Sequence, residues 1–214
     1  MSSLALAADV AATCVVAPFV GSALGASGRV DALLLPRRSI RALGTRLATV
    51  FGTGVALTGL VSAVHLAGSS FSDQTAFHMS RVVLLACAST AMVAAGTCAA
   101  ATLRDPLDAG AVVSLASLVA AFACLGAGPA IDLLPRSLLG FALAVSPFTA
   151  AASAAGLDIM HDEWIYRLSP LAHEQLPFVD WRLSAAAYVF AAVLCTVATS
   201  WRTSRRRDLA PDQA

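Results

Sequence analysis

The chain has 214 residues, of which 58% are hydrophobic and only 13% charged, and its formal net charge is +1. Soluble domains carry about twice this charged fraction, and disordered chains are far less apolar, so both classes are excluded. The near-neutral charge excludes a general basic field for nucleic acid, and no nucleic-acid partner is expected. The composition indicates an integral membrane protein, and we expect an all-α helical bundle in a lipid bilayer.

Six apolar stretches approach the roughly 20 residues that a helix needs to cross a bilayer. They cover residues 4–25, 47–68, 82–103, 109–130, 137–157 and 183–201. Five of them contain no Asp, Glu or Arg, and the first contains only Asp9, near its start. We therefore predict a single transmembrane domain over residues 1–207 and a short polar tail over 208–214.

The distribution of Arg predicts the orientation of these helices. Arg residues cluster between the first two stretches, in residues 29–46, and again in residues 202–207. Both clusters should be cytoplasmic, so an even number of crossings must separate them. Five stretches lie between the clusters, and 137–157 is the weakest because Pro147 at its middle removes a helix hydrogen bond.

Two topologies follow from residues 137–157. If this stretch re-enters from outside, the chain has five crossings, with ten Arg inside and four outside. If it crosses as a kinked helix, the chain has six crossings, with eight Arg inside and six outside. The sequence thus predicts five to six transmembrane helices with a re-entrant or kinked helix before the last one, and the Arg distribution favours re-entry.

Residues 36–46 predict a short basic amphipathic helix on the cytoplasmic surface. Pro36 is tolerated in its first turn, and Ile40, Leu43 and Leu47 share one face. One interpretation is an orientation-setting loop on anionic lipid, and the other is a docking helix for a cytoplasmic partner. The candidate docking residues are Pro36, Arg37, Arg38, Ile40, Arg41 and Leu43.

Residues 158–182 predict two short helices lying on the outer membrane surface. Their aromatic side chains favour the headgroup layer, and Pro170 ends the first helix. The candidate residues of this outer cap are Trp164, Tyr166, Pro170 and Trp181. Trp181 and Trp201 are 20 residues apart, and this spacing brackets the final crossing.

Catalytic motifs are absent from the sequence. There is no GxxxxGK[ST] loop, so this chain is not expected to hydrolyse ATP, and Pro177 stands where a zinc protease would need its second His after His173. No catalytic residues and no metal motif are predicted. Imidazoles can nevertheless bind transition metals or haem, and in this topology all four lie on the outer side. These metal candidates are His65, His78, His161 and His173.

The layout resembles that of the membrane (permease) subunits of bacterial type-2 ABC exporters. The matching features are the segment Pro36–Arg46, the tight turn Arg104–Asp108, the sequence Ser146-Pro147-Phe148, the stretch Leu168–His173 and the basic tail Arg202–Arg207. The resemblance implies a partner P-loop ATPase subunit that hydrolyses ATP. It also implies a second membrane subunit or a homodimer.

Two functions are therefore expected from the sequence. The first is a transporter subunit, multi-pass in the bacterial plasma (inner) membrane, with no cofactor of its own. The second is a membrane anchor or assembly subunit of a redox, metal-handling or haem-handling complex that uses the outer His residues. All 14 basic residues are Arg, which fits a GC-rich bacterial source.

Overall fold

The computed structural model of the chain describes residues 3–31, 40–68, 79–103, 105–126, 135–157 and 180–208. Every regular element in these residues is an α-helix. The helices are α1 (Ser3–Asp31), α2 (Ile40–Gly68), α3 (Met79–Ala100), α4 (Pro106–Gly126), α5 (Arg136–Val145), α6 (Pro147–Ala154) and α8 (Trp181–Asp208).

Four helices, α1, α2, α3 and α8, are long and apolar enough to cross a membrane. The α5–α6 pair is bent by 74° and would make a fifth span if it were counted as one. Residues Pro106–Phe122 of α4 form a shorter apolar helix. The expected all-α membrane fold, with a bent helix pair before the last span, is confirmed.

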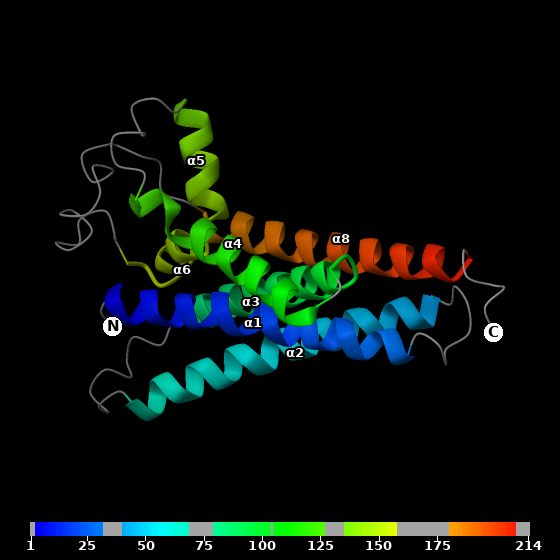
Figure 1. Ribbon diagram of the computed structural model, residues 1–214. Helices are drawn as coiled ribbons and strands as arrows, with labels where there is room; N and C mark the ends of the chain where they lie inside the picture. The colour runs from blue at the N-terminus through cyan, green and yellow to red at the C-terminus, as the bar shows by residue number, and fades with distance from the viewer. Residues whose placement is uncertain are drawn as a thin grey trace.

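Helix α3 lies at the centre of the bundle. It packs most extensively against α1 and α8, and also against α2 and α4. Helices α1, α3 and α8 run in one direction, and α2 and α4 run back (Figure 1). The end of α4, the α5–α6 pair and the start of α8 all lie at the left-hand end in Figure 1, where α5 projects sideways. This is the arrangement expected if residues 137–157 enter the bundle and leave it at the same end.

Glycines allow α1 and α3 to approach closely. A Cβ atom added at Gly21 of α1 would lie 2.2 Å from the Val93 carbonyl oxygen, and one at Gly96 of α3 would lie 2.3 Å from the Pro18 carbonyl oxygen. Neither position can accept a side chain without moving the facing backbone. Backbone-to-backbone packing of this kind is typical of helices in lipid, where small residues replace a hydrophobic driving force.

Large apolar side chains cover the outside of the bundle as well as filling its core. Phe148 and Leu84 are fully buried, whereas Leu60, Leu115 and Phe190 are each more than 60% exposed on the outer faces of α2, α4 and α8. Because such a surface suits hydrocarbon better than water, it agrees with the apolar helix lengths. The chain is therefore a multi-pass helical membrane protein.

Two helix boundaries differ from those expected. Residues 40–46 form the first turns of α2 instead of a separate surface helix, because nothing between Ile40 and the apolar stretch breaks the helix. Helix α3 begins at Met79, so Arg81 lies inside a helix and not in the outer loop. Arg81 can enter the bundle because an acidic side chain meets it there, as described below.

Candidate functional site at the broken helix

The candidate site is built around the break between α5 and α6. Ser146 is extended, with φ −67° and ψ 121°, and Pro147 occupies the first turn of α6. In an unbroken helix the carbonyls of residues 143–145 would accept hydrogen bonds from the N–H groups of residues 147–149. Pro147 has no N–H, and the bend moves the next two N–H groups away, so these carbonyls need other donors.

Side chains supply those donors. The Thr149 hydroxyl turns back and donates to the Leu143 carbonyl. The Ser184 hydroxyl of α8 donates to the Ala144 carbonyl over 2.7 Å. In a membrane an unsatisfied carbonyl costs several kcal/mol, so these hydrogen bonds make the bend tolerable.

Tyr188, one turn after Ser184 on α8, is the third donor to the carbonyls that the break leaves free. Its hydroxyl donates to the Val145 carbonyl over 2.7 Å, while its ring is 8% exposed and packs with the buried core. The last two carbonyls of α5 are thus held by two hydroxyls of one helix. Helix α8 therefore fixes the position of the break.

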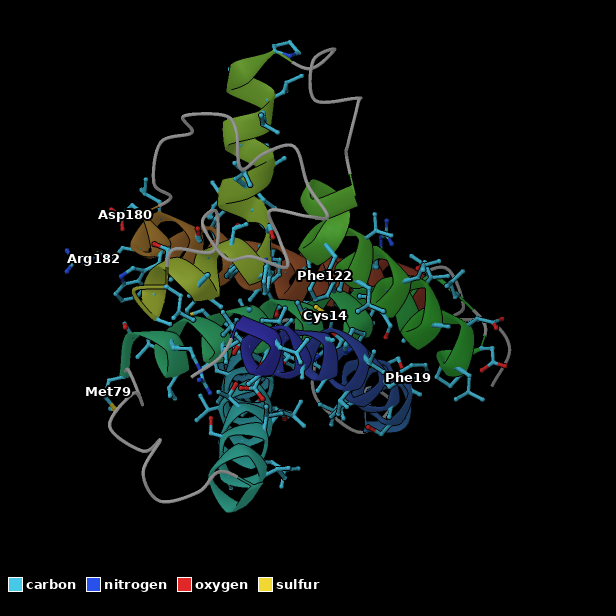
Figure 2. All side chains as sticks on the ribbon, turned by 90° about the vertical axis from the view of Figure 1, so that its left-hand side faces the viewer. Cys14, Phe19, Met79, Phe122, Asp180 and Arg182 are labelled. Carbon is cyan, nitrogen blue, oxygen red and sulfur yellow. The ribbon has the colours of Figure 1, made fainter. Side chains whose placement is uncertain are left out.

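Helix α6 is buried against several other helices. The Ser146 hydroxyl donates to the Ala121 carbonyl of α4 over 2.8 Å, and the Ser80 hydroxyl of α3 donates to the Ala154 carbonyl. The rings of Phe122 and Phe148 have centroids 5.5 Å apart. In contrast, α5 stands away from the bundle in the end-on view, above the labelled Phe122 (Figure 2).

A buried ion pair joins α1 to α3. The Arg81 Nη2 atom lies 2.9 Å from the Asp9 Oδ2 atom, and the two side chains are only 2% and 10% exposed. Asp9 is near the start of α1 and Arg81 near the start of α3, so the pair belongs to the same end of the bundle as the broken helix. Intramembrane charges of this kind are expensive and are a common mark of function.

The sequence did not identify this ion pair because each charge stood at the edge of an apolar stretch. Arg81 directly precedes the stretch 82–103 and is one of the four Arg residues that the Arg distribution places outside, and Asp9 is the only charge in the first stretch. One signal in the sequence is that Asp9 and Arg81 have opposite charges and lie near the starts of two apolar stretches that both begin on the predicted outer side of the membrane. Predicting the pair requires knowing that α1 and α3 are neighbours, and the sequence separation of Asp9 and Arg81 does not show which helices pack together.

A second polar contact lies at the opposite end of the bundle. The Arg46 Nη1 atom of α2 donates to the Ser200 hydroxyl over 3.2 Å and to the Thr203 hydroxyl over 3.3 Å, both on α8. Arg46 is the last residue of the segment Pro36–Arg46, which the sequence suggests as a docking helix. The N-terminal part of α2 is therefore tied to the C-terminal part of α8.

Most of the predicted docking residues lie outside the described part. Pro36, Arg37 and Arg38 are not among the described residues, and for Ile40 and Arg41 only the backbone is described. Leu43 is half-buried on α2. Docking of a partner at this segment stays a prediction.

The outer cap and the His residues are described only in small part. Trp164, Tyr166 and Pro170 lie outside the described residues. Trp181 starts α8, packs against the core cluster and carries the Arg182 guanidinium 5.8 Å from its ring centroid. His78, His161 and His173 lie outside the described part, and His65 is described only as backbone near the end of α2.

The described residues contain no group of three or more His, Cys, Asp or Glu side chains arranged to hold a metal ion. No family model, curated protein or solved structure matches the chain.

Proposed function

We propose that this chain is the membrane-spanning subunit of a bacterial ABC-type exporter, and that a separate P-loop ATPase subunit hydrolyses the ATP. The observation that supports this proposal most is the broken helix α5–α6, which lies between the last two long helices and is fixed by Ser184 and Tyr188. Broken helices at membrane depth are typical of transporters, where they lie along the substrate path.

The cost of the break favours transport over a passive role. Irregular backbone within the apolar layer is tolerated only where it is buried in protein or lines a cavity. A simple membrane anchor would be more stable with an uninterrupted helix here. Helices α3, α4 and α8 all contribute hydrogen bonds to this one junction, which supports a role for it in function.

The proposed mechanism uses the two ends of the bundle differently. The ATPase subunit docks on residues 36–46 at the cytoplasmic end, and its motion tilts α2. A second membrane subunit, or a second copy of this chain, completes a path for a hydrophobic or amphipathic substrate past the broken helix. The charge distribution supports an inner-membrane location, because the Arg-rich ends of the helices face one side.

Co-purification with an ATPase tests the proposal. The full chain carries a C-terminal affinity tag, is co-expressed with its neighbouring genes and is purified in mild detergent. We expect vanadate-sensitive ATP hydrolysis in the purified complex. Changing Arg37, Arg38 and Arg41 to Glu should reduce this activity by about tenfold, because charge complementarity at the docking surface is reversed.

A matched control changes Arg205, Arg206 and Arg207 to Glu, which alters the charge by the same amount on the same predicted cytoplasmic side. This variant should retain the ATPase. A complex without ATPase activity that instead shows a haem absorbance band or bound metal would overturn the proposal. It would favour the anchor subunit of a redox, metal-handling or haem-handling complex.

A further inference from the structure

We infer that α8 is the connecting helix that transmits movement of the docking segment to the broken helix at the opposite end of the bundle. Its use in transport rests on the proposed function, whereas the mechanical connection is a property of this chain alone. Arg46, Ser184 and Tyr188 are the positioning residues of this connection.

The first contact of the connection is at the cytoplasmic end. Arg46 lies in the same uninterrupted helix, α2, as residues 40–45 of the docking segment, so a push on those residues reaches Arg46 along one helix. The guanidinium group is bonded to two hydroxyls of α8, at Ser200 and Thr203. Charge-assisted hydrogen bonds to two points one turn apart fix both the height and the rotation of α8 relative to α2.

The second contact is at the outer end. Ser184 and Tyr188 donate to the two consecutive carbonyls with which α5 ends. These carbonyls have lost their helical donors at Pro147, so α8 cannot shift without either carrying the end of α5 with it or leaving carbonyls unsatisfied. Because α5 projects from the bundle, it is the part of the junction with the most room to move (Figures 1 and 2).

Helix α8 is stiff enough to transmit movement from the first contact to the second. It runs without interruption from Trp181 to Asp208 and contains neither Gly nor Pro. Each of the other long helices, α1 to α4, contains at least one Gly, and α1 also contains Pro18. Ser184 and Ser200 are separated by a helical rise of about 24 Å. A helix of this kind moves as a rod, since Gly and Pro are the usual positions of kinks.

Hydrogen exchange measures the connection without any partner protein. The purified full chain in lipid nanodiscs is compared with Arg46→Gln, and with Arg202→Gln as a control exposed at the same end. Arg46→Gln should speed exchange of the amides in residues 135–157 by at least about fivefold, the ratio expected for the loss of one of its two hydrogen bonds to α8. The Arg202→Gln control should leave these amides unchanged.

Coupling between two sites is reciprocal, so the opposite experiment must agree. Tyr188→Phe, which removes one hydroxyl at the outer end, should speed exchange in residues 40–50 by a similar factor. If Arg46→Gln does not fold, the double variant Ser200→Ala, Thr203→Val removes the same contact from α8 and serves in its place.

A third variant tests the rigidity of α8 itself. Replacing Ala191 and Ala198 by Gly leaves both contacts intact but softens the helix between them. In this background Arg46→Gln should no longer affect residues 135–157. Unchanged exchange at the outer end in every variant would overturn the connecting role of α8 while leaving the ATPase co-purification result unaffected. A chain that shows the connection but recruits no ATPase would instead overturn the proposed function alone.

Discussion

Asp9 and Arg81 place two opposite charges inside the bundle, where the other buried side chains of the described residues are apolar or carry hydroxyl groups. Removing two ions from water is costly, and their mutual attraction offsets that cost only while both are present and well oriented. The pair lies between α1 and α3, the helices that also approach most closely through Gly21 and Gly96. We therefore expect the pair to fix the register of this contact more than it adds to stability.

A comparison of a single variant with a double variant checks this argument. Asp9→Ala should lower the free energy of unfolding by about 3 kcal/mol, because it leaves a buried guanidinium without its carboxylate. The double variant Asp9→Leu, Arg81→Met should recover most of that loss, since neither charge remains. The free energies would be measured by denaturant titration of the chain in detergent micelles, with Asp105→Asn as an exposed control. A single variant within about 0.5 kcal/mol of the original protein would contradict the argument.

Helix α8 and the broken helix depend on each other. The α5 helix ends because Pro147 lacks an N–H, and the position of its end is set by the two hydroxyls of α8. Helix α6 resumes at once, capped by Ser146, whose hydroxyl accepts from the Thr149 N–H over 3.4 Å. The break is therefore a defined geometry that side chains of α3, α4 and α8 hold from several sides.

Removing either hydroxyl should destabilise the junction. Ser184→Ala and Tyr188→Phe should each lower the free energy of unfolding by about 1–2 kcal/mol, since each leaves a buried carbonyl without a donor. Ser137→Ala provides the control, because Ser137 is exposed on α5, and its effect should stay within about 0.5 kcal/mol. Thermal unfolding followed by circular dichroism would rank the three variants, and equal melting temperatures would show that the hydroxyls do not hold the break.

The sequence predicted the existence and place of this break but not its partners. Ser146-Pro147 in the middle of an apolar stretch indicates a bend, because proline chemistry is local. Which side chains satisfy the freed carbonyls depends on the packing of α8 against α5, some 40 residues away. The sequence also predicts a separate surface helix where residues 40–46 form the first turns of α2. A basic amphipathic pattern fits both a helix on the lipid surface and the first turns of a longer helix, so the pattern alone does not distinguish them.

The arrangement of the helices in the bundle agrees with the distribution of Arg along the chain. The end of α1, the start of α2 and the end of α8 lie together at one end of the bundle (Figure 1), and these helix ends carry Arg29, Arg41, Arg46 and four Arg residues between 202 and 207. Apolar length and charge asymmetry act on every membrane helix as it inserts, so they can be read from sequence without knowing the packing. The order of neighbours around α3 depends on small residues meeting across helices, and the sequence alone did not predict it.

This arrangement predicts on which side of the membrane each loop lies. Helix α4 ends and α8 begins at the same end as the α5–α6 pair, so residues on both sides of that pair should face the same compartment. In a background with all five native Cys changed to Ala, Asp132→Cys and Asp158→Cys should both react with a membrane-impermeant maleimide on intact cells. Ser39→Cys and Ala214→Cys should react only after the membrane is permeabilised, because the Arg clusters beside them favour the cytoplasm. Labelling of positions 132 and 158 from opposite sides would mean that α5 and α6 together cross the bilayer as one kinked span, and Ala214 would then be accessible from outside.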